Sequence, residues 1–77
     1  LPDDLERYRS IYRMLTSDLP KESRPTIDRI APLGGTDHRL MLLRGSLLAA
    51  IRDDEDALKA FRRAVELADR VPETWAA

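Results

Sequence analysis

Apolar residues recur three and four positions apart through most of this 77-residue chain, and no stretch alternates apolar and polar residues as a half-buried strand would. Spacing of this kind places side chains on one face of a helix. Proline and glycine interrupt the pattern at Pro20, Pro32 and Gly34–Gly35, where helices begin or end. The sequence therefore predicts an all-α fold of short helices joined by brief turns.

Four helices and the beginning of another segment are expected from the capping residues and prolines: Asp4 to about Ser17, a short helix ending before Pro32, His38 to about Ile51, Asp54 to about Val71, and a segment from Pro72. Asp3 and Glu6 have the spacing of a capping box at the first helix. Asp37 and Asp53 are expected to cap the third and fourth helices, because a carboxylate accepts hydrogen bonds from free first-turn amides.

Length, charge and cysteine content exclude several classes of function. A chain of 77 residues leaves little room for an enclosed active site with supporting residues around it. Its 13 basic and 14 acidic residues lack the basic excess of a dedicated nucleic-acid binder. The absence of cysteine excludes disulfides, zinc fingers and a thiol nucleophile. No apolar run approaches the roughly 20 residues that span a bilayer, so we expect no membrane insertion.

The residues that could carry chemistry have ordinary structural interpretations. The acidic run Asp53–Asp56 lacks the spacing of a calcium-binding loop and fits a helix N-terminus. His38 is the one histidine and has few partners for catalysis or metal binding. Arg7, Arg9 and Arg13 alternate with tyrosines, as in a single-strand binder, but Arg7 and Arg9 point to opposite sides of a helix. We expect no catalytic residue, no metal, no cofactor and no nucleic-acid partner.

The central segment carries a more specific pattern, Met41-x2-Arg44-Gly45-x2-Leu48 followed by Ala57-x3-Phe61 and Ala64. It resembles the tetratricopeptide repeat, a helix pair repeated every 34 residues. Met41 stands where the family has Trp, Arg44 where it has Leu, and Asp69 where it has Pro. Trp75 follows Met41 by 34 residues and falls in the Trp position of a following repeat.

The resemblance implies antiparallel helix pairs stacked as a short α–α superhelix. A degenerate repeat is expected at about residues 4–35, a good repeat at about 37–71 and the start of another at 72–77. Ile11 occupies the position of Gly45 in the degenerate repeat, so we expect it to push the first helix pair apart. Gly45 is expected to face small alanines, and Phe61 to fill the seam to the next pair. The repeat-packing residues are then Gly45, Leu48, Ala57, Phe61, Ala64 and Trp75.

The resemblance also implies a non-catalytic protein-interaction module. Tetratricopeptide repeats bind peptides or helices on a concave face lined by the first helix of each pair. By position, that lining is Arg39, Leu42, Ser46, Ala49 and Ala50 from the good repeat, with Leu5, Tyr8, Tyr12, Leu15 and Thr16 from the degenerate one. Because this lining is apolar, an apolar peptide or helix is the expected partner.

Two alternatives remain at this point. The apolar side of the fourth helix near Phe61, Val65 and Leu67, with Trp75 beyond it, could bind a second copy of the chain. The chain could also be the accessory arm of a larger enzyme. It begins with Leu1 rather than Met, and we expect it to be a piece of a longer protein.

Overall fold

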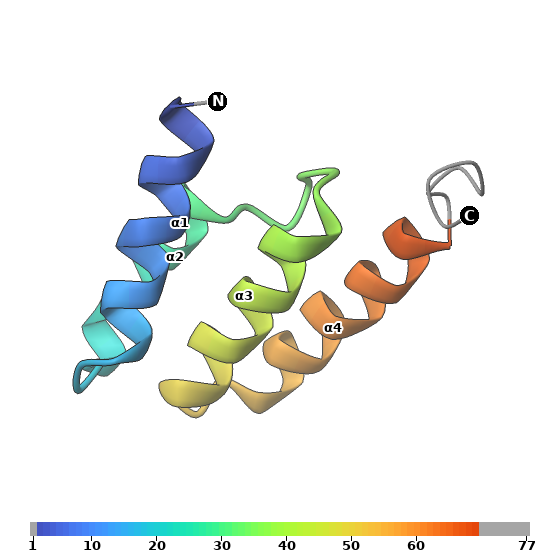
Figure 1. Ribbon diagram of the computed structural model, residues 1–77. Coiled ribbons are helices and arrows are strands. Elements are labelled where there is room, and N and C mark those ends of the chain that lie inside the picture. Colours follow the sequence, from blue (N-terminus) through green and yellow to red (C-terminus); the bar gives the residue numbers. More distant parts are fainter. Residues whose placement is uncertain (1, 70–77) are drawn as a thin grey trace.

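The computed structural model describes residues 2–69, with side chains from residue 5 onward. This part of the chain is all-helical and contains no strand, which confirms the expected fold class (Figure 1). Its elements are α1 (Pro2–Leu15), the short 3-10 helix η1 (Lys21–Ser23), α2 (Arg24–Ile30), α3 (His38–Ala50) and α4 (Asp54–Ala68). The expected segment from Pro72, with Trp75, lies outside the described residues.

Helix α3 is the central element of the fold. It packs along α4 on one side, as an antiparallel pair, and contacts α1 and α2 on the other (Figure 1). Neighbours on both sides explain why apolar residues surround most of α3 instead of forming one stripe. The largest fully buried side chains come from three helices and meet around α3: Ile11, Ile27, Met41, Leu47 and Leu48.

Helices α1 and α2 contact α3 more than they contact each other. Ile11 points into the core and is fully buried. A hollow of about 480 Å³ opens between α1 and α2, lined by residues of both helices that include Ser10, Met14 and Ile30. The first helix pair is therefore less closely packed than the pair formed by α3 and α4.

Close packing of α3 on α4 depends on Gly45 and Phe61. A Cβ atom at Gly45 would lie 2.5–2.7 Å from three carbons of the Phe61 ring, closer than real Cβ atoms approach other groups. The expectation placed Ala57 and Ala64 opposite Gly45, but the structure places the Phe61 ring there, within its own helix pair. A large ring fits against bare backbone, because glycine has no side chain to oppose it.

The turn from α3 to α4 ends α3 with a left-handed residue. Arg52 has φ 69°, its amide donates to the carbonyl of Ala49 at 3.0 Å, and the amide of Asp53 donates to the carbonyl of Leu48 at 2.8 Å. These two bonds define a Schellman motif, in which the left-handed position is usually glycine. The motif turns the chain so that α4 returns along α3.

The predicted helix caps have three different outcomes. Asp37 caps α3 as expected, since its carboxylate accepts a hydrogen bond from the Arg39 amide at 2.9 Å. Asp53 occupies the N-cap position of α4 as expected, but its carboxylate makes no capping bond and pairs with Arg24 instead. Helix α1 begins at Pro2, before the expected cap at Asp3, because proline suits a first helical turn.

Candidate functional site

An open groove of about 410 Å³ lies between α1 and α3. Positions 5, 8 and 12 share one face of α1, and positions 39, 42 and 43 share one face of α3. The two helices lie side by side, so these faces meet (Figure 1). The groove is lined by Leu5, Tyr8, Tyr12, Arg39, Leu42 and Leu43.

Three apolar side chains of the groove are open to water. Leu5 is 54% exposed, Tyr12 58% and Leu42 46%. Single exposed apolar residues are common on protein surfaces, but several gathered in one hollow indicate a binding surface. Covering them with a partner would release about 25 cal/mol for each Å² of apolar surface removed from water.

Asp37 fixes the polar side of the groove. Its Oδ2 accepts a hydrogen bond from the Tyr8 hydroxyl, and its Oδ1 accepts one from the Arg39 amide. Burial alone would raise the pKa of Asp37, but these two bonds and the charge of Arg39 outweigh it and lower the pKa below its usual value. The ionised carboxylate therefore links α1 to the start of α3 and holds the Tyr8 ring in place.

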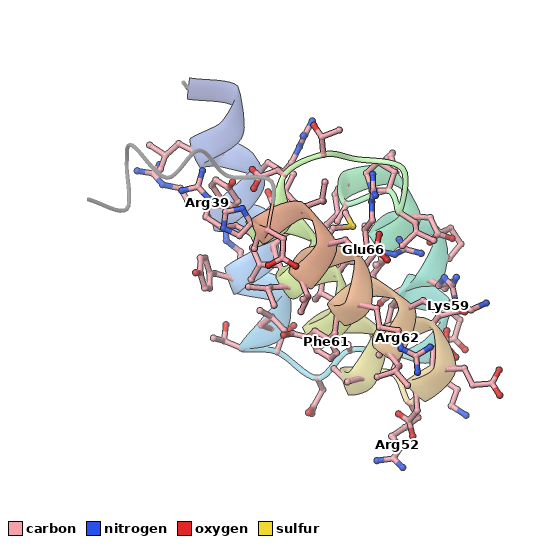
Figure 2. All side chains as sticks on the ribbon, turned by 90° about the vertical axis from the view of Figure 1, so that its right-hand side faces the viewer. Arg39, Arg52, Lys59, Phe61, Arg62 and Glu66 are labelled. Carbon is pink, nitrogen blue, oxygen red and sulfur yellow. The ribbon has the colours of Figure 1, made fainter. Side chains whose placement is uncertain are left out.

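Arg39 supplies the one charge in the groove lining. Its guanidinium lies 5.7 Å from the centre of the Tyr8 ring, within cation–π range. The side chain is 69% exposed, and its Nε lies 3.6 Å from Oδ1 of Asp37. Figure 2 shows Arg39 beside α1, on the far side of the molecule from Arg62 on α4.

Some of the residues predicted for the groove line one hollow in the structure, and the others lie outside it. Arg39, Leu42, Tyr8 and Tyr12 come together, with Leu5 from the wider expectation. The other expected residues lie outside the lining: Ser46, whose hydroxyl donates to the Leu42 carbonyl, Ala49 and Ala50, which are exposed further along α3, and Leu15 and Thr16.

Two observations explain these differences. Leu15 packs against the core instead of facing the groove. Leu43 was missed, although it follows Arg39 by one helical turn and so shares its face. The groove therefore occupies the first half of α3 rather than its whole length.

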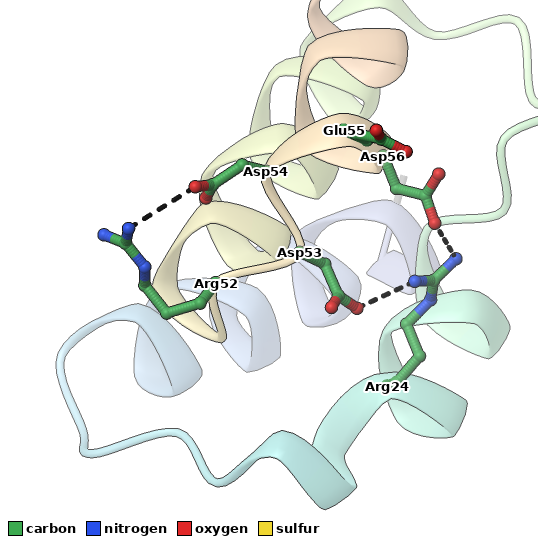
Figure 3. Close-up of a pocket in the computed structure, with 6 residues that line it drawn as sticks. All are labelled: Arg24, Arg52, Asp53, Asp54, Glu55 and Asp56. Atoms are coloured by element: carbon green, nitrogen blue, oxygen red, sulfur yellow. Dashed lines mark hydrogen bonds and ion pairs between the residues drawn. The ribbon is translucent and has the colours of Figure 1, made fainter.

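A second polar cluster joins α2 to the start of α4. The Arg24 guanidinium lies 2.8 Å from the carboxylate of Asp53 and 2.9 Å from that of Asp56 (Figure 3). It also lies 3.1 Å from the carboxylate of Asp28, one turn further along α2. These pairs raise the pKa of Arg24, with the Asp53 bond contributing most. The pairs with Asp53 and Asp56 link the start of α2 to the start of α4.

Arg44 extends this cluster into the core. The residue is only 4% exposed, its Nη1 donates to the Ala31 carbonyl at 2.9 Å, and its Nη2 lies 2.9 Å from Asp28. Its Nε is buried without a hydrogen-bond partner. Sequence reasoning saw Arg44 only as a departure from the repeat pattern and missed this role, because its partners are on another helix.

The acidic run Asp53–Asp56 therefore has a structural role. Asp53 and Asp56 pair with Arg24, and Asp54 lies 3.4 Å from Arg52 (Figure 3). Among residues 2–69, no group of three or more His, Cys, Asp or Glu residues is arranged to hold a metal ion. The hollow in front of these carboxylates has a volume of about 280 Å³, is open to solvent and is crossed by the ion pairs of Arg24 and Arg52.

Comparisons with known protein families, with curated proteins and with solved structures find no match to this chain. The resemblance to the tetratricopeptide repeat therefore rests on the residues quoted from the sequence. In the part of the chain that the structure describes, no helix is long and apolar enough to cross a membrane.

Proposed function

We propose that this chain is a non-catalytic protein-interaction module that holds a partner peptide or helix in the groove between α1 and α3. The observation that carries the proposal is the gathering of Leu5, Tyr12 and Leu42, all about half exposed, in one hollow of about 410 Å³. A partner that inserts apolar side chains there would bury surface that the folded chain leaves in water.

We further propose that the helices are arranged as in a tetratricopeptide repeat. Two features support this. Helices α3 and α4 form a closely packed antiparallel pair (Figure 1), although the ring against Gly45 is that of Phe61 and not an alanine side chain. The groove is lined by α1 and α3, which would be the first helices of successive pairs.

Preorganisation of the groove would favour binding. The Tyr8 ring is held by Asp37, and α3 is packed between its neighbours. A partner would therefore not have to order the Tyr8 ring or α3 itself when it binds. The surface is small, however, and repeat proteins gain surface by adding repeats, so a modest affinity is expected.

The proposal is tested by selecting peptides from a displayed random library. The chain itself is one bait, and its Leu42→Asp variant is a second. Leu58→Asp is the matched control, because Leu58 is 49% exposed on α4 and Leu42 is 46% exposed in the groove. We expect enriched peptides with apolar anchors that bind the unmodified chain and Leu58→Asp but not Leu42→Asp. Peptides that bind Leu42→Asp as well as the unmodified chain would reject the groove as the binding surface, and so would a selection that enriches no peptide.

Self-association is a second candidate, favoured by the apolar surface of α4. Of the residues expected there, Val65 is 61% exposed, whereas Leu67 is buried and Phe61 packs against the core. Leu58, which is 49% exposed, lies two helical turns before Val65 on the same side of α4. The expected contact through Trp75 lies outside the described residues. Light scattering over a wide concentration range tests the idea: a dimer that Leu58→Asp and Val65→Asp together dissociate would support it. A constant mass of 8.8 kDa would exclude it.

The remaining candidate is that the chain is the accessory arm of a larger enzyme. In that case the groove would still be the surface that binds a partner.

A further inference from the structure

We infer that the groove selects partners that carry an Asp or Glu side chain beside their apolar anchors, and that Arg39 determines this selectivity. The inference rests on the proposed function of the groove. It adds the chemistry of the partner, an acidic amphipathic peptide or helix.

The local contacts of Arg39 contribute little to the stability of its own helix. It lies in the first turn of α3, and a cation there faces the positive end of the helix dipole, where an acidic residue would be favourable. Its side chain is 69% exposed and so buries little surface. Its ion pair with Asp37, at 3.6 Å, offsets part of this cost, but exposed pairs of this kind contribute little to stability.

The contacts of Arg39 leave its donors available. The nearest carboxylate oxygen, Oδ1 of Asp37, is 3.6 Å from its Nε, which is longer than a hydrogen bond, and that oxygen already accepts from the Arg39 amide. A guanidinium has five N–H donors and binds carboxylates in a two-point geometry. The Tyr8 ring, 5.7 Å away, helps to hold the guanidinium at the groove.

The charge that a partner in the groove would meet is that of Arg39. The groove lining contains Arg39 and no carboxylate, and the carboxylate of Asp37 beside it already accepts from Tyr8 and from the Arg39 amide. Charges of both signs lie along α1, where Glu6, Arg7 and Arg9 are exposed and form no ion pair within the described residues. The groove face of α1 extends from position 5 to position 12, about 10 Å of helix, which matches about two turns of a partner helix. A partner helix of that length can place one carboxylate within reach of Arg39 while its apolar side chains cover the apolar positions of the groove.

The test compares three baits with the same random library: the unmodified chain, Arg39→Glu and the control Arg62→Glu. Arg62 is exposed on α4 and outside the groove, so the control makes the same change of charge elsewhere (Figure 2). We expect Asp and Glu to be enriched beside apolar anchors by the unmodified chain and by Arg62→Glu. Arg39→Glu should enrich Lys and Arg at the corresponding position.

A binding measurement then gives the size of the effect. On the unmodified chain, changing the acidic residue of a selected peptide from Glu to Gln should weaken binding about five- to tenfold. On Arg39→Gln, which keeps the side chain polar but neutral, the two peptides should bind equally. Thermal melting of each variant confirms that it is folded.

The possible results distinguish the role of Arg39 from the proposed function of the groove. Peptides that depend on Leu42 but show no acidic preference, or that bind Arg39→Glu unchanged, would overturn the role of Arg39 and leave the groove as the binding surface. Peptides that do not depend on Leu42 would overturn both.

Discussion

Gly45 lies so close to the Phe61 ring that a methyl group has no room there. Gly45→Ala gains about 1 kcal/mol of helix propensity, but overpacking in a tight contact costs about 1–3 kcal/mol. We expect a net loss of stability, seen as a lower urea midpoint, and partial recovery when Phe61→Leu is added. Gly34→Ala is the control, because nothing lies within 4 Å of its added methyl group. Equal midpoints for the two single variants would contradict this packing.

Arg52 adopts a conformation that glycine adopts more easily. Its φ of 69° is unfavourable for a residue with a side chain, and its exposed pair with Asp54, at 3.4 Å, contributes little to stability. Arg52→Gly should therefore raise the free energy of unfolding by about 1 kcal/mol. Arg52→Ala removes the same ion pair and keeps the strain, so it should give no gain. A gain with Ala as large as with Gly would reject the explanation.

These two residues differ in how far the sequence predicts them. A glycine inside an apolar helix indicates a close approach, and Gly45 has one, although the partner is a phenyl ring rather than an alanine. No feature of the sequence marks Arg52 as left-handed, because Gly or Asn is the usual signal at that position.

Among the elements, α2 depends most on its neighbours. Seven residues are too few for a helix that is stable alone, and α2 is anchored by Ile27 in the core and by the ion pairs of Arg24 and Asp28. Apolar spacing and proline positions predict that a short helix exists here. They do not predict its anchoring, because Arg24 is 29 residues from Asp53 and Arg44 is 16 residues from Asp28.

The anchoring of α2 should depend on pH. Desolvation opposes ionisation of Asp28, but hydrogen bonds and charge from Arg24 and Arg44 outweigh it and lower its pKa below the ordinary 3.8. Ionised Asp28 therefore stabilises the fold above about pH 4, and this contribution is lost as the pH falls through the lowered folded-state pKa.

The pH dependence of urea unfolding tests this. Asp28→Asn should lower stability at pH 7, because it leaves the buried Arg44 without its carboxylate. The difference between the unmodified chain and the variant should shrink on acidification below pH 4. Asp18→Asn is the control, since Asp18 is exposed and forms no ion pair in the part of the chain described. A difference for Asp28→Asn that is constant with pH would contradict the assignment.

In the whole molecule, the fold class was predictable and the groove only in part. Helical spacing, together with the caps and breakers, determines the all-α architecture. The resemblance to a helix-pair repeat predicted one groove containing Arg39, Leu42, Tyr8 and Tyr12, and these four residues line one hollow in the structure. It extended the groove too far, to Ser46 and Ala49, because position in a repeat does not specify how α1 crosses α3. That crossing depends on the packing of Ile11 and its neighbours in the core.

Whether the groove between α1 and α3 holds a partner is tested by measuring, with calorimetry, the affinity of the best library-selected peptide. We expect Leu42→Asp to weaken binding at least about tenfold, because it places a charge among apolar contacts. Leu58→Asp should leave the affinity unchanged. Equal losses in the two variants would contradict specific binding in the groove. A loss in Leu58→Asp alone would place the binding surface on α4.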